Sequence, residues 1–232
     1  MTKLEIIPLE GIPEISPGDD LVEIIGQLDN IQSGDILVVT QKIISKAENQ
    51  MIKIDPNDPL SHKPLVERES VRILRRRGDL IISQTKHGFV CANAGIDLSN
   101  VERGQAALLP DDSDRSARRL RDGLAGRFHL DVGIIISDTF GRPWRRGLTD
   151  VAIGSAGVLP ILDLRGSPDA FGREMQVTEV ALVDELASAA ELVMGKSSGI
   201  PIAIVRGADM SWFGNGSVQE QIVRDPQDDL FR

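Results

Sequence analysis

Seven short apolar runs, separated by glycine, proline and polar residues, constrain the fold of this chain more than any other feature. Their length and β-branched content are typical of buried strands, and they lie at residues 4–7, 36–40, 80–83, 89–92, 106–109, 132–137 and 202–205. Helical patterns lie between several of them, but strands and helices do not strictly alternate. The sequence therefore predicts an α+β fold with mixed or antiparallel sheets, packed helices and two intimately associated lobes, not a doubly wound Rossmann fold.

Three segments show helical spacing of apolar residues. Residues 20–28 place Leu21, Ile24, Ile25 and Leu28 on one face, and residues 113–124 form a basic amphipathic pattern. The longest segment, residues 177–194, carries a broad Ala/Leu/Val face and ends before a glycine. Its expected N-cap is Thr178, and we expect it to be a core helix.

Composition places the chain among average globular proteins. Its 232 residues suffice for one large domain or two small packed ones; no boundary is sharp, so we treat residues 1–232 as a single domain. A net charge of −9 argues against nucleic acid and membrane surfaces as partners. We see no signal peptide and no apolar run of about 20 residues, and the single cysteine, Cys91, fits a reducing compartment. A cytoplasmic protein with a small, buried Cys91 is expected.

Two acidic segments suggest chemistry. Residues 93–100 combine small residues with Asp97 and Asn100, while Asp138 and Thr139 directly follow the strand expected at 132–137. Each segment alone is also explained as an ordinary turn. Hard cations such as Mg²⁺ and Mn²⁺ prefer oxygen ligands contributed by separate segments. Together, the segments therefore favour a metal-assisted phosphate site.

Several other motifs fit an anionic ligand, each with a structural alternative. Lys42 and Lys46 share a face of a helix that follows strand 36–40; they suit a phosphate or are simply solvated, since no Walker glycines are present. The glycine-rich residues 195–199 either cradle phosphates or end a helix. Residues 142–146 combine arginines with a tryptophan, which suits a phosphorylated or carboxylated ligand carrying a ring, or a surface turn.

Two further features are left open by the sequence. His87 is either an acid–base group or a structural residue, and single histidines are more often structural. The proline-rich residues 55–64 form either a mobile flap or a plain connection. No spaced set of cysteine and histidine supports a zinc site.

Taken in order, these segments resemble the coenzyme F-420:L-glutamate ligase family, which adds glutamate to the deazaflavin precursor F-420-0. The similarity covers nearly the whole chain and is carried by residues 8–13, 38–48, 87–100, 137–157, 171–174 and 194–207. It implies a GTP-dependent ligase that phosphorylates the terminal carboxylate of F-420-0, after which the amine of L-glutamate attacks the acyl phosphate. It also implies a two-lobed α+β fold that forms a homodimer.

The resemblance also implies the site residues. Mg²⁺ or Mn²⁺ would be held by Asp97, Asp138 and Thr139, and K⁺ is a further candidate cation. GTP contacts would come from Ile12, Pro13, Glu14, Ile15, Gln41, Lys42, Lys46, Asn100, Met194, Gly195, Lys196, Ser197, Ser198, Gly199 and Ile200. One departure stands out: some relatives carry an acidic or amide metal ligand where this chain has Lys196. A protonated lysine cannot coordinate a metal, so we expect it to contact phosphate or to leave that ligand to water or another group.

The residues alone leave two other functions open. A metal-dependent phosphohydrolase could use the same aspartates with water as acceptor. A noncatalytic nucleotide- or flavin-binding module would bind without turnover. The resemblance favours the ligase over both, and no general base is identified.

Overall fold

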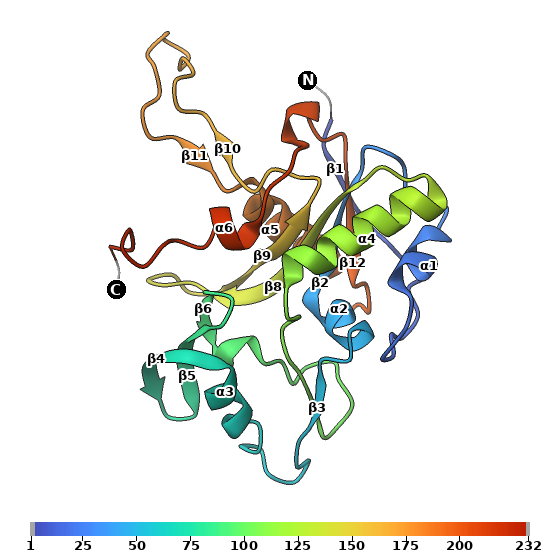
Figure 1. Ribbon diagram of the computed structural model, residues 1–232, viewed down its shortest axis with the longest axis vertical. Helices are drawn as coiled ribbons and strands as arrows, with labels where there is room; N and C mark the ends of the chain where they lie inside the picture. The colour runs from blue at the N-terminus through green and yellow to red at the C-terminus, as the bar shows by residue number, and fades with distance from the viewer. Residues whose placement is uncertain (1–2, 231–232) are drawn as a thin grey trace.

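A computed structural model describes residues 3–230, and its centre is a five-stranded sheet (Figure 1). The strand order is β1 (Glu5–Pro8), β12 (Ile202–Arg206), β2 (Ile36–Thr40), β8 (Gly133–Gly141) and β9 (Leu148–Ala156). β2 and β8 are parallel, whereas the other neighbours are antiparallel. The sheet is therefore mixed, which confirms the predicted α+β class.

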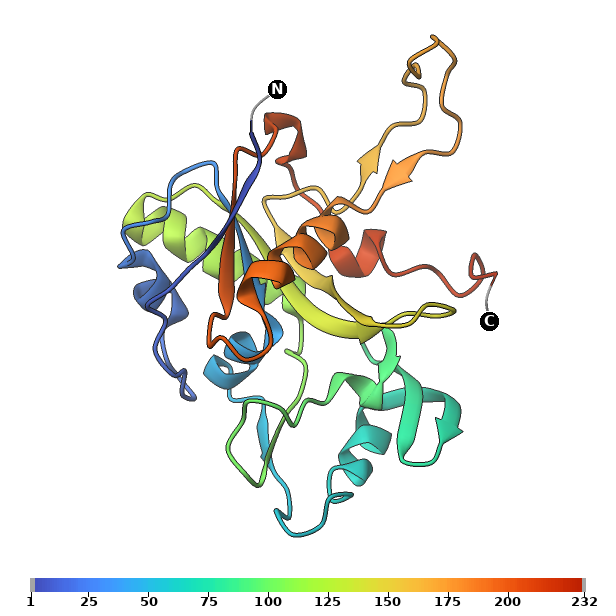
Figure 2. The ribbon, with the colours of Figure 1, turned by 180° about the vertical axis from the view of Figure 1, so that it is seen from behind.

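Two helices cover opposite faces of this sheet. α4 (Ser113–Phe128) crosses in front of the sheet in Figure 1, and α5 (Leu182–Met194) crosses in front of it in the reverse view of Figure 2. Because both faces are covered, the central strands are apolar throughout rather than alternating. Ile36, Leu37, Ile134, Ile135 and Ile204 are all fully buried.

The helix boundaries differ from the predicted ones for local reasons. α5 begins at Leu182 rather than near residue 177, and Thr178 is not its N-cap, because β11 (Glu179–Val180) pairs with β10 (Leu162–Asp163). α4 is one turn longer than predicted: Asp112 caps its start by accepting from Arg115 N at 2.8 Å. α1 (Leu21–Gly26) is shorter than predicted and is capped by Asp20. At both helix starts the carboxylate satisfies a backbone N–H that has no partner within the helix.

A small lobe, residues 51–108, is inserted between α2 (Gln41–Ala47) and α4. It contains α3 (Lys63–Glu69), a sheet of β4 (Ser70–Arg77), β5 (Leu80–Thr85) and β6 (Val90–Ala92), the short helix η1 (Asn93–Gly95), and a ladder of β3 (Met51–Lys53) with β7 (Gln105–Ala107). It has a separate hydrophobic cluster, formed by Val66, Ile81, Ala94, Ile96, Ala106 and Leu108. We call the remainder the large lobe.

All seven predicted strand runs are strands or adjoin them, but five strands were not predicted. β4 is an arginine-rich edge strand and β9 is a polar, small-residue strand, so neither has a continuous apolar run. β3, β10 and β11 have only two or three residues each. The proline-rich residues 55–64 form a series of turns that leads into α3.

The C-terminal part of the chain completes the large lobe. It contains η2 (Met210–Trp212), then α6 (Val218–Gln221), whose start is held by the buried Asp114 through Ser217 Oγ at 2.7 Å and Val218 N at 3.0 Å. Within residues 3–230, none of the helices combines the length and the apolar character that crossing a membrane requires.

Candidate active site

The predicted metal ligands Asp138 and Thr139 lie where the parallel pairing of β2 and β8 ends. That pairing runs from Ile36↔Gly133 to Thr40↔Ser137, so the carboxyl ends of two parallel strands meet here, where α/β sheets commonly bind ligands. β8 does not end at Ser137 as predicted, however. It continues to Gly141 because its last residues pair with β9, with Thr139 opposite Asp150. Asp138 and Thr139 therefore lie within a strand and not after it.

Asp150 is the functional residue that the sequence analysis missed. The residue is 3% exposed, and its Oδ1 accepts from Thr139 Oγ1 at 2.6 Å and from Lys196 Nζ at 2.8 Å, while Oδ2 accepts from Ser137 Oγ at 3.1 Å. A usable signal was present. The sequence turns at Gly147, and an antiparallel hairpin around that turn puts Asp150 beside Thr139.

Lys196 lies inside this network. Its Nζ contacts Thr139 Oγ1 at 2.6 Å and Glu191 Oε1 at 3.2 Å, in addition to Asp150. Burial lowers the pKa of Lys196, but the bonds to Asp150 and Glu191 outweigh it, so the pKa is raised. Lys196 is therefore a cation held next to the carboxylates.

Asp97 approaches from the small lobe. Its Oδ2 pairs with Lys42 Nζ at 2.8 Å and its Oδ1 accepts from Ser99 N at 2.7 Å. Burial opposes ionisation, but these bonds prevail and lower the pKa of Asp97. The turn before it is tight: Gly95 has φ of +71°, and an added Cβ would lie 2.9 Å from Leu109.

Asp138 is the carboxyl group of the site whose pKa is raised. Its surroundings raise its pKa to about 7, first because the half-buried carboxyl loses much of its contact with water and then because the carboxylates of Asp97 and Asp150 are near. Only the bond from Thr139 N, at 2.8 Å, and the more distant Lys42 act in the other direction. Three carboxyl groups from β8, β9 and the small lobe therefore converge here, and the position attracts positive charge.

The predicted nucleotide contacts form two groups. Asn100 Nδ2 donates to Lys196 O at 3.2 Å, which joins the small lobe to the loop between α5 and β12. In that loop Met194 is buried at the end of α5, Gly195 has φ of +63°, and Ser198 Oγ donates back to Met194 O. Through Lys196, this loop contacts Asp150 on one side and Asn100 of the small lobe on the other.

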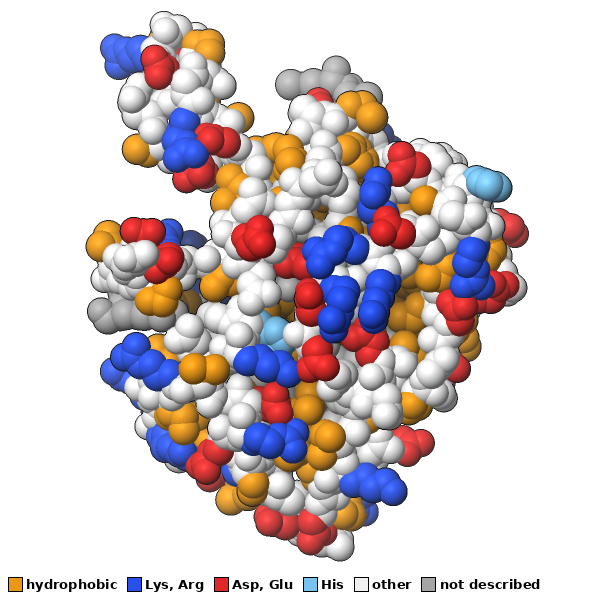
Figure 3. Space-filling view, in the orientation of Figure 1, with side chains coloured by type: hydrophobic (Ala, Val, Ile, Leu, Met, Phe, Trp, Pro, Cys, Tyr) orange, Lys and Arg blue, Asp and Glu red, His pale blue; other side chains and the backbone are white. Residues whose placement is uncertain are grey.

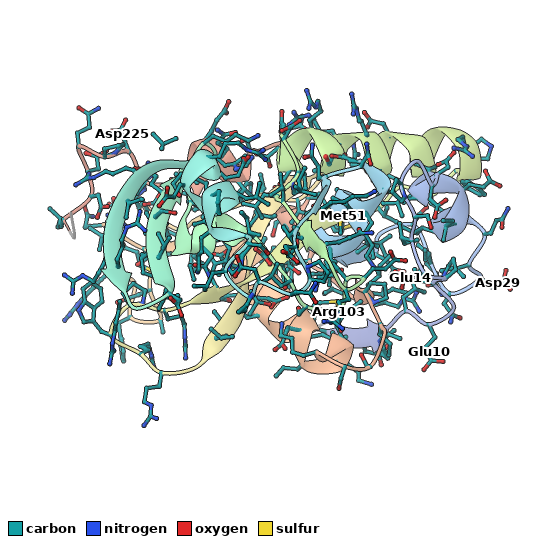
Figure 4. All side chains as sticks on the ribbon, turned by 90° about the horizontal axis from the view of Figure 1, so that it is seen from below. Glu10, Glu14, Asp29, Met51, Arg103 and Asp225 are labelled. Carbon is teal, nitrogen blue, oxygen red and sulfur yellow. The ribbon has the colours of Figure 1, made fainter. Side chains whose placement is uncertain are left out.

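The second group lies on α2 and the loop after β1. Lys46 forms an ion pair with Glu14, and Ile15 is buried against the core. Gln41 is buried as well: its Nε2 donates to Leu108 O at 2.8 Å, so its side chain holds α2 to the small lobe. Figure 4 shows Glu14 and Glu10 in the same half of the molecule, across from Asp225 in the C-terminal segment.

The oxygen donors at the site suit a hard divalent cation, but they are paired with lysines. Among residues 3–230, no three histidine, cysteine, aspartate or glutamate side chains are arranged together to hold a metal ion. Lys42 contacts Asp97, and Lys196 contacts Asp150. The donor chemistry of Asp97, Asp138, Asp150 and Thr139 still fits Mg²⁺ or Mn²⁺, and the raised pKa of Asp138 marks a place short of positive charge.

The other motifs occupy the surroundings. The arginines of residues 142–146 are exposed at the tip of the β8–β9 hairpin, with Trp144 81% exposed and φ of +56°. Cys91 is buried as predicted, and its burial together with the Asp138 carboxylate raises the thiol pKa to about 12. His87 is also buried and stacks on Phe89, with centroids 5.9 Å apart.

Comparison with known proteins gives a consistent result. The family model for F420-0:gamma-glutamyl ligase matches residues 11–207. The chain is 42% identical over 247 residues to the coenzyme F420:L-glutamate ligase of Methanopyrus kandleri and 41% identical over 248 residues to that of Methanocaldococcus jannaschii. Both alignments cover 99% of this chain and 97% of the relative. With the same protein of Methanothermobacter thermautotrophicus, identity is 39% over 249 residues, covering 99% of each chain. The chain therefore belongs to the F420-0:gamma-glutamyl ligase family.

Proposed function

We propose that this protein is a GTP-dependent ligase that joins L-glutamate to the deazaflavin precursor F-420-0 in the biosynthesis of coenzyme F420. The observation that carries the proposal is the convergence of Asp97, Asp138 and Asp150 with Lys42 and Lys196 at the end of the parallel pair β2–β8. Family membership supplies the reaction class, and this cluster supplies charges of both signs for a phosphoryl transfer.

The reaction has two balanced steps. An oxygen of the F-420-0 carboxylate attacks the γ-phosphorus of GTP, a P–O bond breaks, and GDP leaves with the electron pair. The amine of glutamate then attacks the carbonyl carbon of the acyl phosphate, phosphate leaves, and the amine gives up a proton to form the amide. Splitting the reaction in this way replaces a poor leaving group by phosphate.

The chain's own residues have separate roles in this proposal. Lys42, Lys46 and Lys196 would bind and orient phosphate oxygens, which requires each to exchange its present carboxylate partner for the ligand. Asp97, Asp138 and Thr139, with Asp150, would hold Mg²⁺ or Mn²⁺. The ion would neutralise charge on the transferred phosphoryl group when bound. K⁺ is a further candidate near the same phosphates.

We also propose that the protein is a homodimer. The arm formed by residues 162–180 extends away from the body in both Figure 1 and Figure 2, and it carries Phe171 and Val177 with 91% and 84% exposure. Exposed apolar residues on a projecting arm favour a partner surface. Light scattering should give twice the monomer mass, and Phe171→Ser with Val177→Ser should reduce it to that of the monomer. If the double variant were still a dimer, the arm would be excluded as the dimer interface.

We place the protein in the cytoplasm. The only cysteine of the chain is present as a buried thiol, which suits a reducing compartment. Fractionation of cells that express the tagged chain would test this, and recovery outside the cytoplasmic fraction would contradict it.

Mass spectrometry tests the activity directly. Purified protein is incubated with F-420-0, L-glutamate, GTP and Mg²⁺ or Mn²⁺, and each component is omitted in turn. A product heavier by one or more glutamyl units, formed only in the complete mixture, supports the ligase. GDP formed without glutamylation would indicate a phosphohydrolase instead, and binding without any turnover would indicate a noncatalytic module.

A further inference from the structure

An apolar groove lies beside the acidic cluster, by which we mean Asp97, Asp138 and Asp150, and it has no role in the chemistry described so far. It encloses about 270 Å³. Phe89 and Val90 of the small lobe form one wall, and Phe140 and Val151 of the β8–β9 hairpin form another. Ile222 and Val223 of the C-terminal segment close the third side.

The groove continues from the acidic cluster. Phe140 lies two residues after Asp138 on β8, so both side chains project from the same face of the hairpin, about 7 Å apart along the strand. On β6, Cys91 lies two residues after Phe89 and is close enough to Asp138 for the carboxylate to raise its pKa. A ligand in the groove can therefore extend directly to the carboxylates.

The walls of the groove suit a flat aromatic group. Phe89 and Phe140 meet edge to face, with centroids 6.0 Å apart and an interplanar angle of 73°, and His87 stacks behind Phe89. Val223 packs tightly on the backbone of Gly88, where an added Cβ would lie 2.7 Å away. Asp184 and Arg224 add polar groups to the lining for the heteroatoms of a ring.

Size and position identify the occupant. Pockets for whole ligands usually enclose about 300–1,000 Å³, so a groove of about 270 Å³ takes a ring system and not a complete coenzyme. The expected nucleotide contacts around Glu14 lie across the molecule from the C-terminal segment at Asp225 (Figure 4). The base of GTP therefore approaches from the other side.

We propose that this groove binds the deazaflavin ring of the acceptor substrate and that the C-terminal residues 222–224 form its outer wall. The proposal rests on the proposed function and specifies how that site recognises its acceptor. Bound there, the ring leaves the rest of the acceptor to run along β8 toward Asp138, so that its terminal carboxylate reaches the phosphates.

A larger cavity, of about 950 Å³, does not compete for this role. It lies between α4 and α6, and residues such as Asp112, Arg118 and Glu220 line it. None of its lining residues belongs to the acidic cluster. Acidic side chains lie among the Lys and Arg side chains over α4 in Figure 3, so that surface has no single charge to select an anion.

Two tryptophan substitutions test the proposal with a matched control. Val90 is 40% exposed and lines the groove, whereas Leu80 is 44% exposed in the same small sheet and does not line it. The probe is 5-deazariboflavin, which has the ring but neither phosphate nor carboxylate. Its binding is measured by fluorescence anisotropy. Val90→Trp should weaken its binding at least about tenfold by filling the groove, and Leu80→Trp should bind like the wild type.

Turnover separates this proposal from the proposed function. If the wild type glutamylates F-420-0, Val90→Trp should raise KM for F-420-0 and leave KM for GTP unchanged. Equal binding of the probe by wild type and Val90→Trp, or displacement of the probe by GDP, would overturn the ring site and leave the ligase intact. Probe binding that Val90→Trp abolishes, in a wild type that glutamylates nothing, would support the ring site and reject the ligase.

Discussion

The two lobes meet at the candidate site but are built very differently. The large lobe has a continuous core, in which Ile36, Ile134 and Ile204 are fully buried between two helices. The separate hydrophobic cluster of the small lobe has only six buried residues, and every residue of β4 after Ser70 is exposed. Burial of apolar area is the main source of stability, so the small lobe should open first. Asp138 and Asp150 therefore belong to the more stable large lobe, and Asp97 belongs to the less stable small lobe.

The largest expected effect on activity comes from a substitution in the large lobe. Asp138→Asn keeps the size of the side chain but removes the charge at the centre of the acidic cluster, so kcat should fall by about 10²–10³, the range seen for removing one key electrostatic group. Steady-state glutamylation measures kcat, and circular dichroism checks the fold. The control is Asp163→Asn on the exposed arm, which should be fully active. Normal turnover by folded Asp138→Asn would remove Asp138 from the site.

Core truncations compare the lobes directly. Ile135→Ala and Ile81→Ala each remove a buried side chain, at a cost of about 2–5 kcal/mol of unfolding free energy. We expect Ile135→Ala to lower hydrogen-exchange protection throughout the chain, and Ile81→Ala to lower it only in β4, β5 and β6. Val71→Ala, at a position that is 70% exposed, should change little. If both core variants lost hydrogen-exchange protection throughout the chain, the two lobes would unfold as one unit.

Lys196 tests the junction between the lobes. Its Nζ contacts Thr139 and Asp150, and its backbone carbonyl accepts from Asn100 of the small lobe. Lys196→Gln keeps a hydrogen-bond donor, on a side chain one atom shorter, but loses the charge, so KM for GTP should rise about tenfold, equivalent to about 1.4 kcal/mol, with a smaller change in kcat. Arg165→Gln on the arm is the matched control. An unchanged KM for GTP would mean that Lys196 only neutralises Asp150.

The two lobes also differ in how well their strands could be predicted from the sequence. In the large lobe, β2 was predicted with its exact bounds, because a strand buried on both faces needs an uninterrupted apolar run. In the small lobe, β4 was missed because its residues read as a charged surface segment, SVRILRRR, and it is ordered mainly by pairing with β5. The local pattern of apolar and polar residues indicates which segments are buried. It does not indicate which segments pair with a strand elsewhere in the chain.

The same limit explains the prediction of the site. Asp138 and Thr139 were predicted from residue type and from their position after an apolar run, and Asp97 from its place in a segment of small residues. The structure brings Asp97 and Asp138 close enough to affect one another. Asp150 was missed because its position depends on the hairpin register, which places it opposite Thr139. Gln41 shows the converse: the resemblance implies that it contacts GTP, whereas in the structure its side chain donates to Leu108 O.

The smallest expected effect is an acid sensitivity of the small lobe. Burial is the largest cause that lowers the pKa of both His62 and His87 below the ordinary 6.5, and it outweighs the nearby backbone carbonyls and carboxylates that act in the other direction. The unfolded chain therefore binds these protons first as the pH falls. Stability is complete above pH 6.5 and is lost below it, by at most about 1.4 kcal/mol per pH unit for each histidine.

Hydrogen exchange at pH 7 and pH 5 measures this effect, with intrinsic exchange rates corrected for pH. Protection of β5 and β6 should fall at pH 5 while that of β2 is retained, and replacing both His62 and His87 by Gln should abolish the difference. Asp97 and Asp111, whose pKa values are lowered below 3.8, act only at still lower pH. Asp138, whose pKa is raised to about 7, binds a proton in the same window, but this favours the folded state and so cannot cause a loss of protection. If β2 lost protection in parallel with β5, acid would be unfolding the whole chain, and the independence of the small lobe would be disproved.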